Sequence, residues 1–348
     1  MKINRLAPWG MALILLATAV FPLNVLAQTQ PPDEITPQDT SYTVFLPMVR
    51  RSSTTTTPTP TPTPRPTIIP NPQLGNIIDH TTLPLYDQIP PEYLRAAEQI
   101  RFYYFDRSVG QNISEGLDCL ASPNWAESPS SCRKYFIDQV VCAAPPDQVK
   151  TYTTRDSVIP EPIRFLGGND RSNIHFEFYM ADYWYSDVQN FVTRYPSLAS
   201  QWDIISLKHN YLHVGEDSSI ARDYFNPNYN GYNIYDILEL EARYPNKTFV
   251  YWTSSLARNA GTSVSESFNN QMRQWARDNN KILLDIADIL SHTPDGQECR
   301  NSQGYAVICC EYTTESAGGH LGSVSAGKLR VAKAIWILLA QLAGWQGP

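Results

Sequence analysis

Four short segments of the chain carry residue types suited to nucleophilic attack on a carbonyl carbon. They contain Ser108, a glycine pair that ends at Gly168, Asn210 and His320, in that order. A serine hydroxyl that is activated by a histidine base can attack an ester, while backbone N–H groups and an asparagine amide can hold the developing oxyanion. The set therefore indicates an acyl-transfer site.

Apolar stretches that precede or separate these residues predict the elements that position them. Strands are expected at 100–105, 162–166, 203–207, 248–252 and 282–286. Helices are expected near 181–195, 233–244, 264–279 and 325–342. Such alternation is typical of an α/β fold in which helices cover a parallel sheet. The working residues of such a sheet lie at the carboxyl ends of its strands, where Ser108, Gly168 and Asn210 are expected.

Short motifs in these segments resemble the sequence blocks of the SGNH, or GDSL-type, hydrolase superfamily. Ser108-Val109-Gly110 resembles its nucleophile block, and Gly319-His320-Leu321 resembles its catalytic-histidine block. Trp202–Asn210 resembles its central strand with the oxyanion asparagine, and Tyr251-Trp252-Thr253 resembles the strand after it. The resemblance spans Ile100 to Trp345 and is to a secreted bacterial member. It implies a flavodoxin-like three-layer α/β/α sandwich with a mainly parallel five-stranded sheet, and the hydrolysis of esters.

The same resemblance implies a role for each residue. Ser108 is the nucleophile and His320 is the general base. The backbone N–H groups of Ser108 and Gly168 form the oxyanion hole together with the side-chain amide of Asn210. The implied reaction removes acyl or acetyl groups through an acyl-enzyme. No metal or organic cofactor is expected, and the chain has neither a C-x-x-C pair nor an H-E-x-x-H pattern.

The stretch Gly167-Gly168-Asn169-Asp170 matches the family's G-x-N-D block literally. In that family the oxyanion glycine follows the second strand and the oxyanion asparagine follows the third. Because the stretch follows the second predicted strand, Gly168 and Asn210 are assigned to these two roles. A further strand at 135–141 would instead make Asn169 the oxyanion asparagine, and this alternative stays open.

The acid of the predicted triad departs from the family pattern. The family usually places an aspartate three residues before the histidine, and Ala317 stands there in this chain. Glu315, five residues before His320, is assigned as the acid, with Asp285 and Asp288 as alternatives. A triad acid chiefly orients and stabilises the histidine, so a Ser–His dyad is a further alternative.

The N-terminal part of the chain is typical of an exported protein. A basic start, a short apolar run at 11–20 and a small-residue cleavage site predict a signal peptide at 1–27. A segment of unknown role follows at 28–51, and the Thr/Pro-rich linker at 52–67 is expected to form a stiff polyproline II spacer. Residues 68–348 form the predicted SGNH hydrolase-like domain. The protein is therefore expected to be secreted and extracellular, or associated with the cell surface.

Tyrosine-rich segments at 179–185 and 224–235 offer rings that can stack on sugars. Together with export on a stiff spacer, they favour an acylated carbohydrate or polysaccharide as the substrate of a monomeric esterase. A lipase-type SGNH esterase is one alternative. A non-catalytic carbohydrate- or surface-binding protein that keeps the fold is the other, and Ala317 favours it, whereas Ser108 and His320 favour the enzyme.

Charge and cysteine content narrow the partners and the compartment. The net charge is −7, and it becomes about −9 once the two basic residues of the signal peptide are removed. An acidic chain without a basic cluster argues against nucleic acid as a partner, and the apolar run is too short for stable insertion into a membrane. Six cysteines in an exported chain favour disulfides. Cys299 is expected to pair with Cys309 or Cys310, and the other pairings are undetermined.

Overall fold

The computed structural model describes a defined set of residues, which comprises 76–133, 135–136, 154–155, 163–169, 171–179, 181–256, 262–313, 319–321 and 326–348. The predicted signal peptide, the segment 28–51, the linker and Glu315 lie outside this set. By its internal contacts, Thr63–Pro348 forms one compact unit. None of the helices in the described part of the chain combines the length and apolar content that a membrane crossing requires.

The nucleophile candidate follows the central strand of a parallel three-stranded sheet. This strand, β2 (Phe102–Asp106), pairs in parallel with β5 (Ile174–Phe178) on one side and with β6 (Ile204–Leu207) on the other. All five residues of β2 are buried, as expected for a nearly continuous apolar run in a sheet that is covered on both faces. The strands predicted at 100–105 and 203–207 are therefore confirmed.

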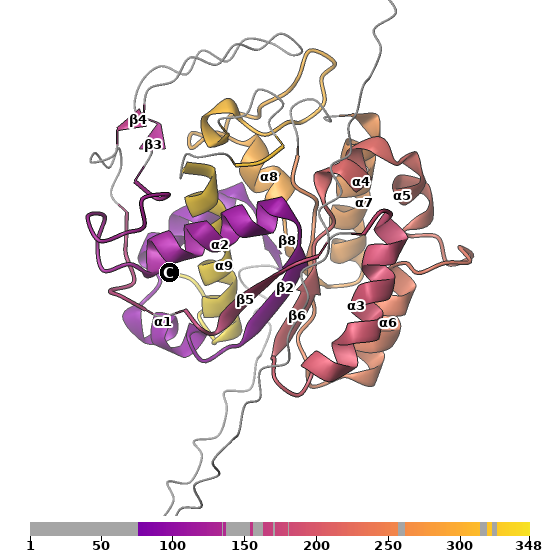
Figure 1. Ribbon diagram of the computed structural model, residues 1–348, viewed down its shortest axis with the longest axis horizontal. Helices are drawn as coiled ribbons and strands as arrows, with labels where there is room; N and C mark the ends of the chain where they lie inside the picture. The colour runs from indigo at the N-terminus through magenta and orange to yellow at the C-terminus, as the bar shows by residue number, and fades with distance from the viewer. Residues whose placement is uncertain are drawn as a thin grey trace, which may run out of the picture. The chain divides into compact units, whose positions relative to one another are not determined.

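Two further predicted strands lie in a second parallel sheet. It contains β1 (Ile77–Ile78), β8 (Ile282–Leu284) and β7 (Val250–Trp252), in that order. A single parallel bridge between Ile204 and Thr248 joins β6 to the residues just before β7. The chain is thus a mixed α/β protein with parallel sheets, and the strands predicted at 248–252 and 282–286 are present. Figure 1 shows β2, β5 and β6 at the centre of the molecule.

The strand predicted at 162–166 is wrong, and β5 takes its place in the sheet. Leu166 instead donates its N–H to the Leu120 carbonyl at 2.8 Å, and Gly167 and Gly168 then turn the chain with φ values of 75° and 88°. β5 reads Ile-His-Phe-Glu-Phe, and the alternation of apolar and polar residues suits an edge strand. That alternation is the signal by which the sequence could have identified it.

The other expected strand, at 135–141, does not belong to the parallel sheets. β3 (Tyr135–Phe136) pairs antiparallel with β4 (Thr154–Arg155) as a separate two-stranded ribbon. No strand of the described parallel sheets therefore lies between β2 and the Gly167–Gly168 turn. The next strand along the chain that pairs with β2 is β5, and β6 follows it.

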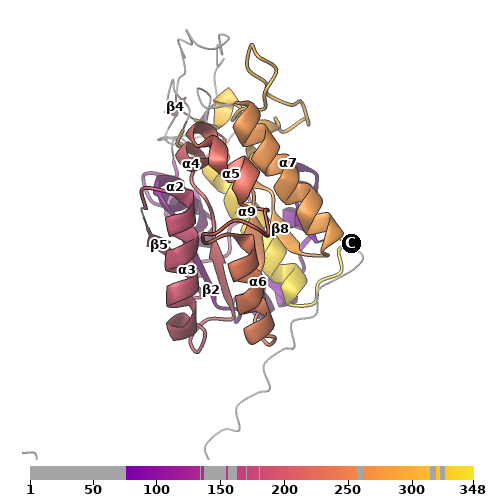
Figure 2. The same ribbon diagram turned by 90° about the vertical axis from the view of Figure 1, so that its right-hand side faces the viewer.

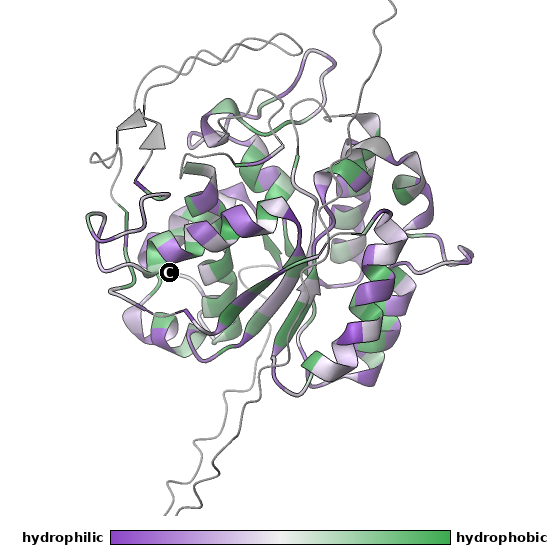
Figure 3. Cartoon of the chain, in the orientation of Figure 1, coloured by the Kyte–Doolittle hydropathy of each residue, from purple (hydrophilic) through white to green (hydrophobic). Residues whose placement is uncertain are grey.

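Helices pack on both faces of the sheet. Phe102 and Tyr104 of β2 belong to one apolar cluster, whereas Tyr103 and Phe105 belong to another, because successive side chains of a strand point to opposite faces. The first cluster includes residues of η1 (His80–Gln88), α1 (Pro91–Ala97), α2 (Ser108–Ala121), α8 (Ile286–Ser291) and α9 (Ala326–Leu342). The second includes residues of α3 (Trp184–Leu198), α4 (Tyr211–Glu216), α5 (Ser218–Asp223), α6 (Ile234–Arg243) and α7 (Ser263–Asp278). Figures 1 and 2 show these two groups from two sides, and in Figure 3 the strands between them are largely hydrophobic.

The predicted helices are present, and their first residues explain where two of them begin. Asn233 and Asp236 form a capping box at the start of α6, and Thr262 and Ser265 form one at the start of α7. Each box satisfies backbone N–H groups that have no partner within the helix. α9 departs from the expected one-sided apolar helix, because nearly all of its residues are buried. Even Lys328 is buried, where it forms an ion pair with Glu115 of α2.

Disulfides join Cys119 to Cys132 and Cys299 to Cys309. The second of these confirms the expected pairing of Cys299 with one of two adjacent cysteines. Cys310 is disulfide-bonded as well, and Cys142 lies outside the described residues.

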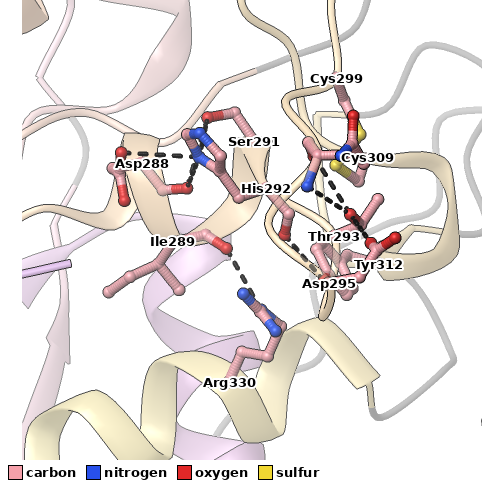
Figure 4. The surroundings of a disulfide bond; sticks show 11 residues. Asp288, Ile289, Ser291, His292, Thr293, Asp295, Cys299, Cys309, Tyr312 and Arg330 are labelled. Atoms are coloured by element: carbon pink, nitrogen blue, oxygen red, sulfur yellow. Dashed lines mark hydrogen bonds and ion pairs between the residues drawn. A yellow bond between two sulfur atoms is a disulfide. The ribbon is translucent and has the colours of Figure 1, made fainter. Parts of the chain in front are cut away.

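The Cys299–Cys309 disulfide stabilises the loop between α8 and the C-terminal part of the chain. Around it, the Tyr312 hydroxyl donates to the His292 carbonyl at 2.9 Å, and Arg330 of α9 donates to the Ile289 carbonyl at 3.2 Å (Figure 4). One side chain from this loop and one from α9 thus donate hydrogen bonds to backbone carbonyl groups at the C-terminal end of α8. The disulfide-bonded loop precedes the segment that carries His320, and α9 follows that segment. Both are therefore connected to the end of α8.

Candidate active site

Ser108 and His320 lie in direct contact, although they are separated by 212 residues in the sequence. The distance between Ser108 Oγ and His320 Nε2 is 2.7 Å. This is within the range over which a general base can accept a proton from a nucleophile. The structure therefore brings together the two residues that the sequence analysis paired as nucleophile and base.

The chain direction at the end of β2 places Ser108 at the start of a helix. Asp106 ends the strand, Arg107 turns the chain with φ −100° and ψ −144°, and Ser108 is the first residue of α2. The first N–H groups of a helix have no carbonyl partner within the helix, and the helix dipole makes this end positive. The first turn of α2 contains no acidic residue. The surroundings of Ser108 Oγ thus favour developing negative charge.

Two neighbouring elements hold the short segment that carries His320. The backbone N–H of Leu321 donates to Asn112 Oδ1 at 3.1 Å, and Asn112 lies one turn after Ser108 on α2. On the other side, the ring of Tyr211 meets the ring of His320 edge-on, with centroids 5.9 Å apart. A Cβ at Gly319 would lie 2.4 Å from the Tyr211 ring, so this close approach requires glycine.

Sequence reasoning did not identify Asn112 or Tyr211 as part of the site. Asn112 lies four residues after Ser108, which is the spacing that places two side chains on the same face of a helix. Tyr211 directly follows Asn210, so it lies next to a residue that had been selected. Both signals are local, but their use depends on knowing where His320 lies.

Gly168 is not an oxyanion donor, and that assignment is wrong. Its backbone N–H donates to the Ala121 carbonyl at 2.9 Å, at the last residue of α2, whereas Ser108 is the first. A helix of this length spans about 20 Å at 1.5 Å per residue. Gly168 is therefore far from Ser108, and its N–H group is already bonded to the Ala121 carbonyl.

Asn169 belongs to the same distant turn as Gly168. Its Oδ1 accepts the Arg171 N–H at 2.6 Å, and the Arg171 guanidinium in turn bonds Ser114 and Asp118 on α2. The literal G-x-N-D match thus forms a loop that packs against the C-terminal half of α2.

The segment that follows β5 lies beside the strand end that precedes Ser108, which is the place predicted for Gly168. Phe178, the last residue of β5, is in register with Asp106, and the Tyr179 N–H donates to the Asp106 carbonyl at 2.9 Å. Asp106 precedes Ser108 by two residues. The assignment of Gly168 therefore fails because the second strand of the sheet, β5, lies later in the chain than predicted.

Asn210 lies at the carboxyl end of β6, the other neighbour of β2. Its Oδ1 caps α4 by accepting the N–H groups of Leu212 and His213, each at 3.0 Å. These two bonds fix the orientation of the amide and leave Nδ2 as the donor. Asn210 Nδ2 lies 2.9 Å from His213 Nδ1. The side chain is buried and held in one orientation, as an oxyanion donor requires.

A buried ion pair connects the strand end before Ser108 to the strand end before Asn210. Lys208 Nζ lies 2.9 Å from Asp106 Oδ1, and both side chains are completely buried. Each of these residues precedes its candidate site residue by two positions. Burial raises the pKa of Asp106 to about 6, although the Lys208 ammonium acts in the opposite direction. The pair thus connects the two turns with two charges that are both withdrawn from water.

The two alternatives to Glu315 as the acid of the predicted triad are bonded elsewhere. Asp285 forms an ion pair with Arg273 at 2.6 Å and accepts the Thr253 hydroxyl at 2.9 Å. Asp288 lies 2.5 Å from His80 Nδ1. Both carboxylates therefore serve other partners, and Glu315 lies outside the described residues.

Comparisons of this chain with protein-family models, with curated proteins and with solved structures found no match. The assignment of a function therefore depends on the geometry of the site.

Proposed function

We propose that this chain is a serine esterase that hydrolyses acyl or acetyl esters through an acyl-enzyme. The observation that carries the proposal is the 2.7 Å contact between Ser108 Oγ and His320 Nε2 at the N-terminus of α2. A serine, a histidine base and a helix N-terminus together supply a nucleophile, a proton acceptor and an anion-stabilising field.

The order of the strands supports the SGNH-type, flavodoxin-like fold. If the bridge between Ile204 and Thr248 joins the two sheets, the spatial order is β5-β2-β6-β7-β8, with β1 added at the edge. Numbered along the chain from β2, this is 2-1-3-4-5, the order of flavodoxin-like sheets. Ser108 then follows the first strand and Asn210 the third, on either side of the point where the strand order reverses.

In the proposed first step, Ser108 Oγ attacks the ester carbonyl carbon while its proton passes to His320 Nε2. The oxyanion of the tetrahedral intermediate accepts hydrogen bonds from the Ser108 N–H and from Asn210 Nδ2. The intermediate then collapses, the bond to the alcohol oxygen breaks, and His320 returns the proton to the leaving alcohol. A water molecule, deprotonated by His320, attacks the acyl-enzyme, releases the acid and regenerates Ser108.

Glu315 remains the proposed acid that orients His320. A Glu315→Gln variant with an unchanged rate would leave Ser108 and His320 as a dyad.

An acylated carbohydrate is the proposed substrate, and the protein is proposed to act outside the cell as a monomer. Phe178 and Tyr183 are 52% and 53% exposed, and Tyr185 stacks on Tyr183 with centroids 5.2 Å apart. Phe178 ends β5 in register with Asp106, and the two tyrosines follow it along the chain. Exposed aromatic faces suit the stacking of sugar rings. The disulfides support an oxidising compartment.

The proposal is tested with the purified protein and two reagents. We expect turnover of p-nitrophenyl acetate, with an initial burst of p-nitrophenol equal to the enzyme concentration. We also expect a fluorophosphonate to label Ser108 stoichiometrically, as measured by mass spectrometry. Ser114→Ala, on the same helix, is the matched control and should label normally. A wild-type protein that neither turns over esters nor reacts with the probe, yet binds acetylated oligosaccharides, would instead be a carbohydrate-binding protein, the function that Ala317 favours.

A further inference from the structure

We propose that Asp187, His209 and His213 bind one zinc ion, or a divalent ion of similar ligand preference, behind the proposed oxyanion asparagine. The three residues come from α3, from the end of β6 and from α4. One donor atom from each lies within 4.8 Å of the other two. Their side chains are buried, so an ion here would connect three elements below the surface of the site.

The distances fit a tetrahedral zinc ion. Asp187 Oδ2 lies 3.0 Å from His213 Nδ1 and 3.6 Å from His209 Nδ1. Ligand atoms at zinc–nitrogen and zinc–oxygen distances of about 2.0–2.2 Å lie about 3.4 Å apart in a tetrahedron. The two observed separations fall on either side of this value, so small side-chain movements would complete the coordination. Two imidazoles and a carboxylate are ligands that zinc accepts at sites with three protein residues.

Several donor atoms of this cluster have no hydrogen-bond partner among the described residues. They are both ring nitrogens of His209 and Oδ1 of Asp187, and all are buried. The 3.6 Å separation between His209 and Asp187 is too long for a hydrogen bond. Buried polar groups in folded proteins are normally bonded, so such exceptions require an explanation. A cation between these atoms provides one.

The charges of the region also favour a cation. The buried ammonium of Lys208 lies 2.9 Å from Asp106 and so compensates that carboxylate. Asp187 adds a second buried negative charge, and its contacts are to two imidazoles. A divalent ion would compensate this charge without requiring a histidine to be protonated.

Among the described residues, two other groups of possible ligands fit an ion less well. His80 and His292 stack with centroids 3.7 Å apart and an interplanar angle of 7°. The lone pairs of stacked rings run parallel and do not converge on one ion. Cys299 and Cys309 are joined in a disulfide, so their sulfurs are not thiolate ligands.

An ion at this site would also act on Asn210, a consequence that rests on the proposed function. Asn210 Nδ2 lies 2.9 Å from His213 Nδ1, and that nitrogen has a single lone pair. Binding of the ion to Nδ1 removes the acceptor of this hydrogen bond and frees the Asn210 N–H for the oxyanion. Zinc binding should therefore raise kcat more than it changes KM.

The experiment measures metal binding without reference to activity. Wild-type protein is treated with a chelator, dialysed and titrated with zinc sulfate, while elemental analysis gives the stoichiometry and thermal unfolding gives the stability. One zinc per chain and a rise of several degrees in Tm that saturates at this ratio are expected. Absence of stoichiometric zinc in the titrated wild type would overturn the proposal.

Variants locate the ion. His209→Phe suits the aromatic contacts of His209 with Tyr224 and Phe268, so it is expected to fold, and its zinc affinity should fall at least tenfold. His292→Phe, at the stacked pair, is the control and should bind zinc normally. A folded His209→Phe protein with wild-type zinc affinity would overturn the proposal. Zinc binding by a wild type that hydrolyses no ester would refute the proposed function and leave the metal site in place.

Discussion

The two ends of helix α2 both carry residues that resemble catalytic motifs, but only one end has the geometry of an active site. At the N-terminal end, Ser108 contacts His320 at 2.7 Å. At the C-terminal end, Gly168 donates its N–H to the Ala121 carbonyl, and Asn169 accepts the Arg171 N–H. The first set faces a free helix N-terminus, whereas the second closes a turn. Residue types that match the same family's motifs thus form different structures at the two ends of this helix.

The physical difference between the two ends lies in the bonding state of their N–H groups. At the start of α2 the backbone N–H groups have no partner within the helix and can serve a ligand. At its C-terminal end the last carbonyl groups have no partner within the helix, and one of them, that of Ala121, accepts the Gly168 N–H. An oxyanion is therefore stabilised at one end and repelled at the other.

The largest effect is expected at the N-terminal end. Ser108→Ala and His320→Ala should each lower kcat for p-nitrophenyl acetate by roughly 10⁴-fold or more, because each removes a group that makes or breaks a bond. The Tm of both variants should stay within a few degrees of the wild type, since both residues lie at loop or helix ends. Ser114→Ala is the control. If Ser108→Ala kept more than a tenth of the wild-type rate, Ser108 would be excluded as the nucleophile.

Removal of one partner of the buried ion pair should have the next largest effect. Lys208→Met leaves the Asp106 carboxylate buried without its cation and should lower the free energy of unfolding by about 3–5 kcal/mol. Lys281→Met, at a half-buried pair with Glu241, is the control and should cost about 1 kcal/mol or less. Urea unfolding measures both values. Equal costs in the two variants would mean that the buried pair does not hold the strand ends.

The pH dependence of the same variant has a defined sign. Burial raises the pKa of Asp106 to about 6, above the ordinary value of 3.8, while Lys208 lowers it; without Lys208 the folded-state pKa rises further. A group with a raised folded-state pKa contributes stability below its unfolded-state pKa and loses this contribution as the pH rises through the folded-state value. The destabilisation of Lys208→Met should therefore be smallest near pH 4 and grow past pH 6. A pH-independent loss in urea titrations would contradict this origin.

A smaller effect is expected at Asn210, because a backbone donor remains. Asn210→Ala should lower kcat by about 10²–10³-fold with little change in KM. Since Asn210 also caps α4, the variant should lose about 1 kcal/mol of stability as well.

The smallest effect is expected at the C-terminal end of α2. Asn169→Ala removes an acceptor for the Arg171 N–H and should change kcat by less than about twofold. Steady-state kinetics beside Asn210→Ala make the comparison direct. If Asn169→Ala were the more damaging of the two, the literal motif match would describe the site and the topological assignment would fail.

The sequence by itself determined features that depend on local periodicity and on residue type. Periodicity located the apolar runs that form β2, β6, β7 and β8. It also located helices α3, α6, α7 and α9. Each of these patterns is contained in one segment of the chain. Ser108 and His320 could be selected because a serine after a strand and a histidine in a glycine-rich loop are visible without their partners. The pairing of Cys299 with Cys309 or Cys310 could be expected because only a short loop separates them, and the structure selects Cys309.

Tertiary structure alone decided which strand lies beside β2 and therefore which loops meet at the site. An apolar run such as 162–166 carries no record of its pairing partner, and its placement against α2 depends on the two glycines that turn it away from the sheet. The burial of Asp106 against Lys208, and the meeting of Asp187 with His209 and His213, join residues from different elements. Such contacts arise from the packing of helices on a twisted sheet, and their energies depend on burial, which no single segment of the sequence specifies.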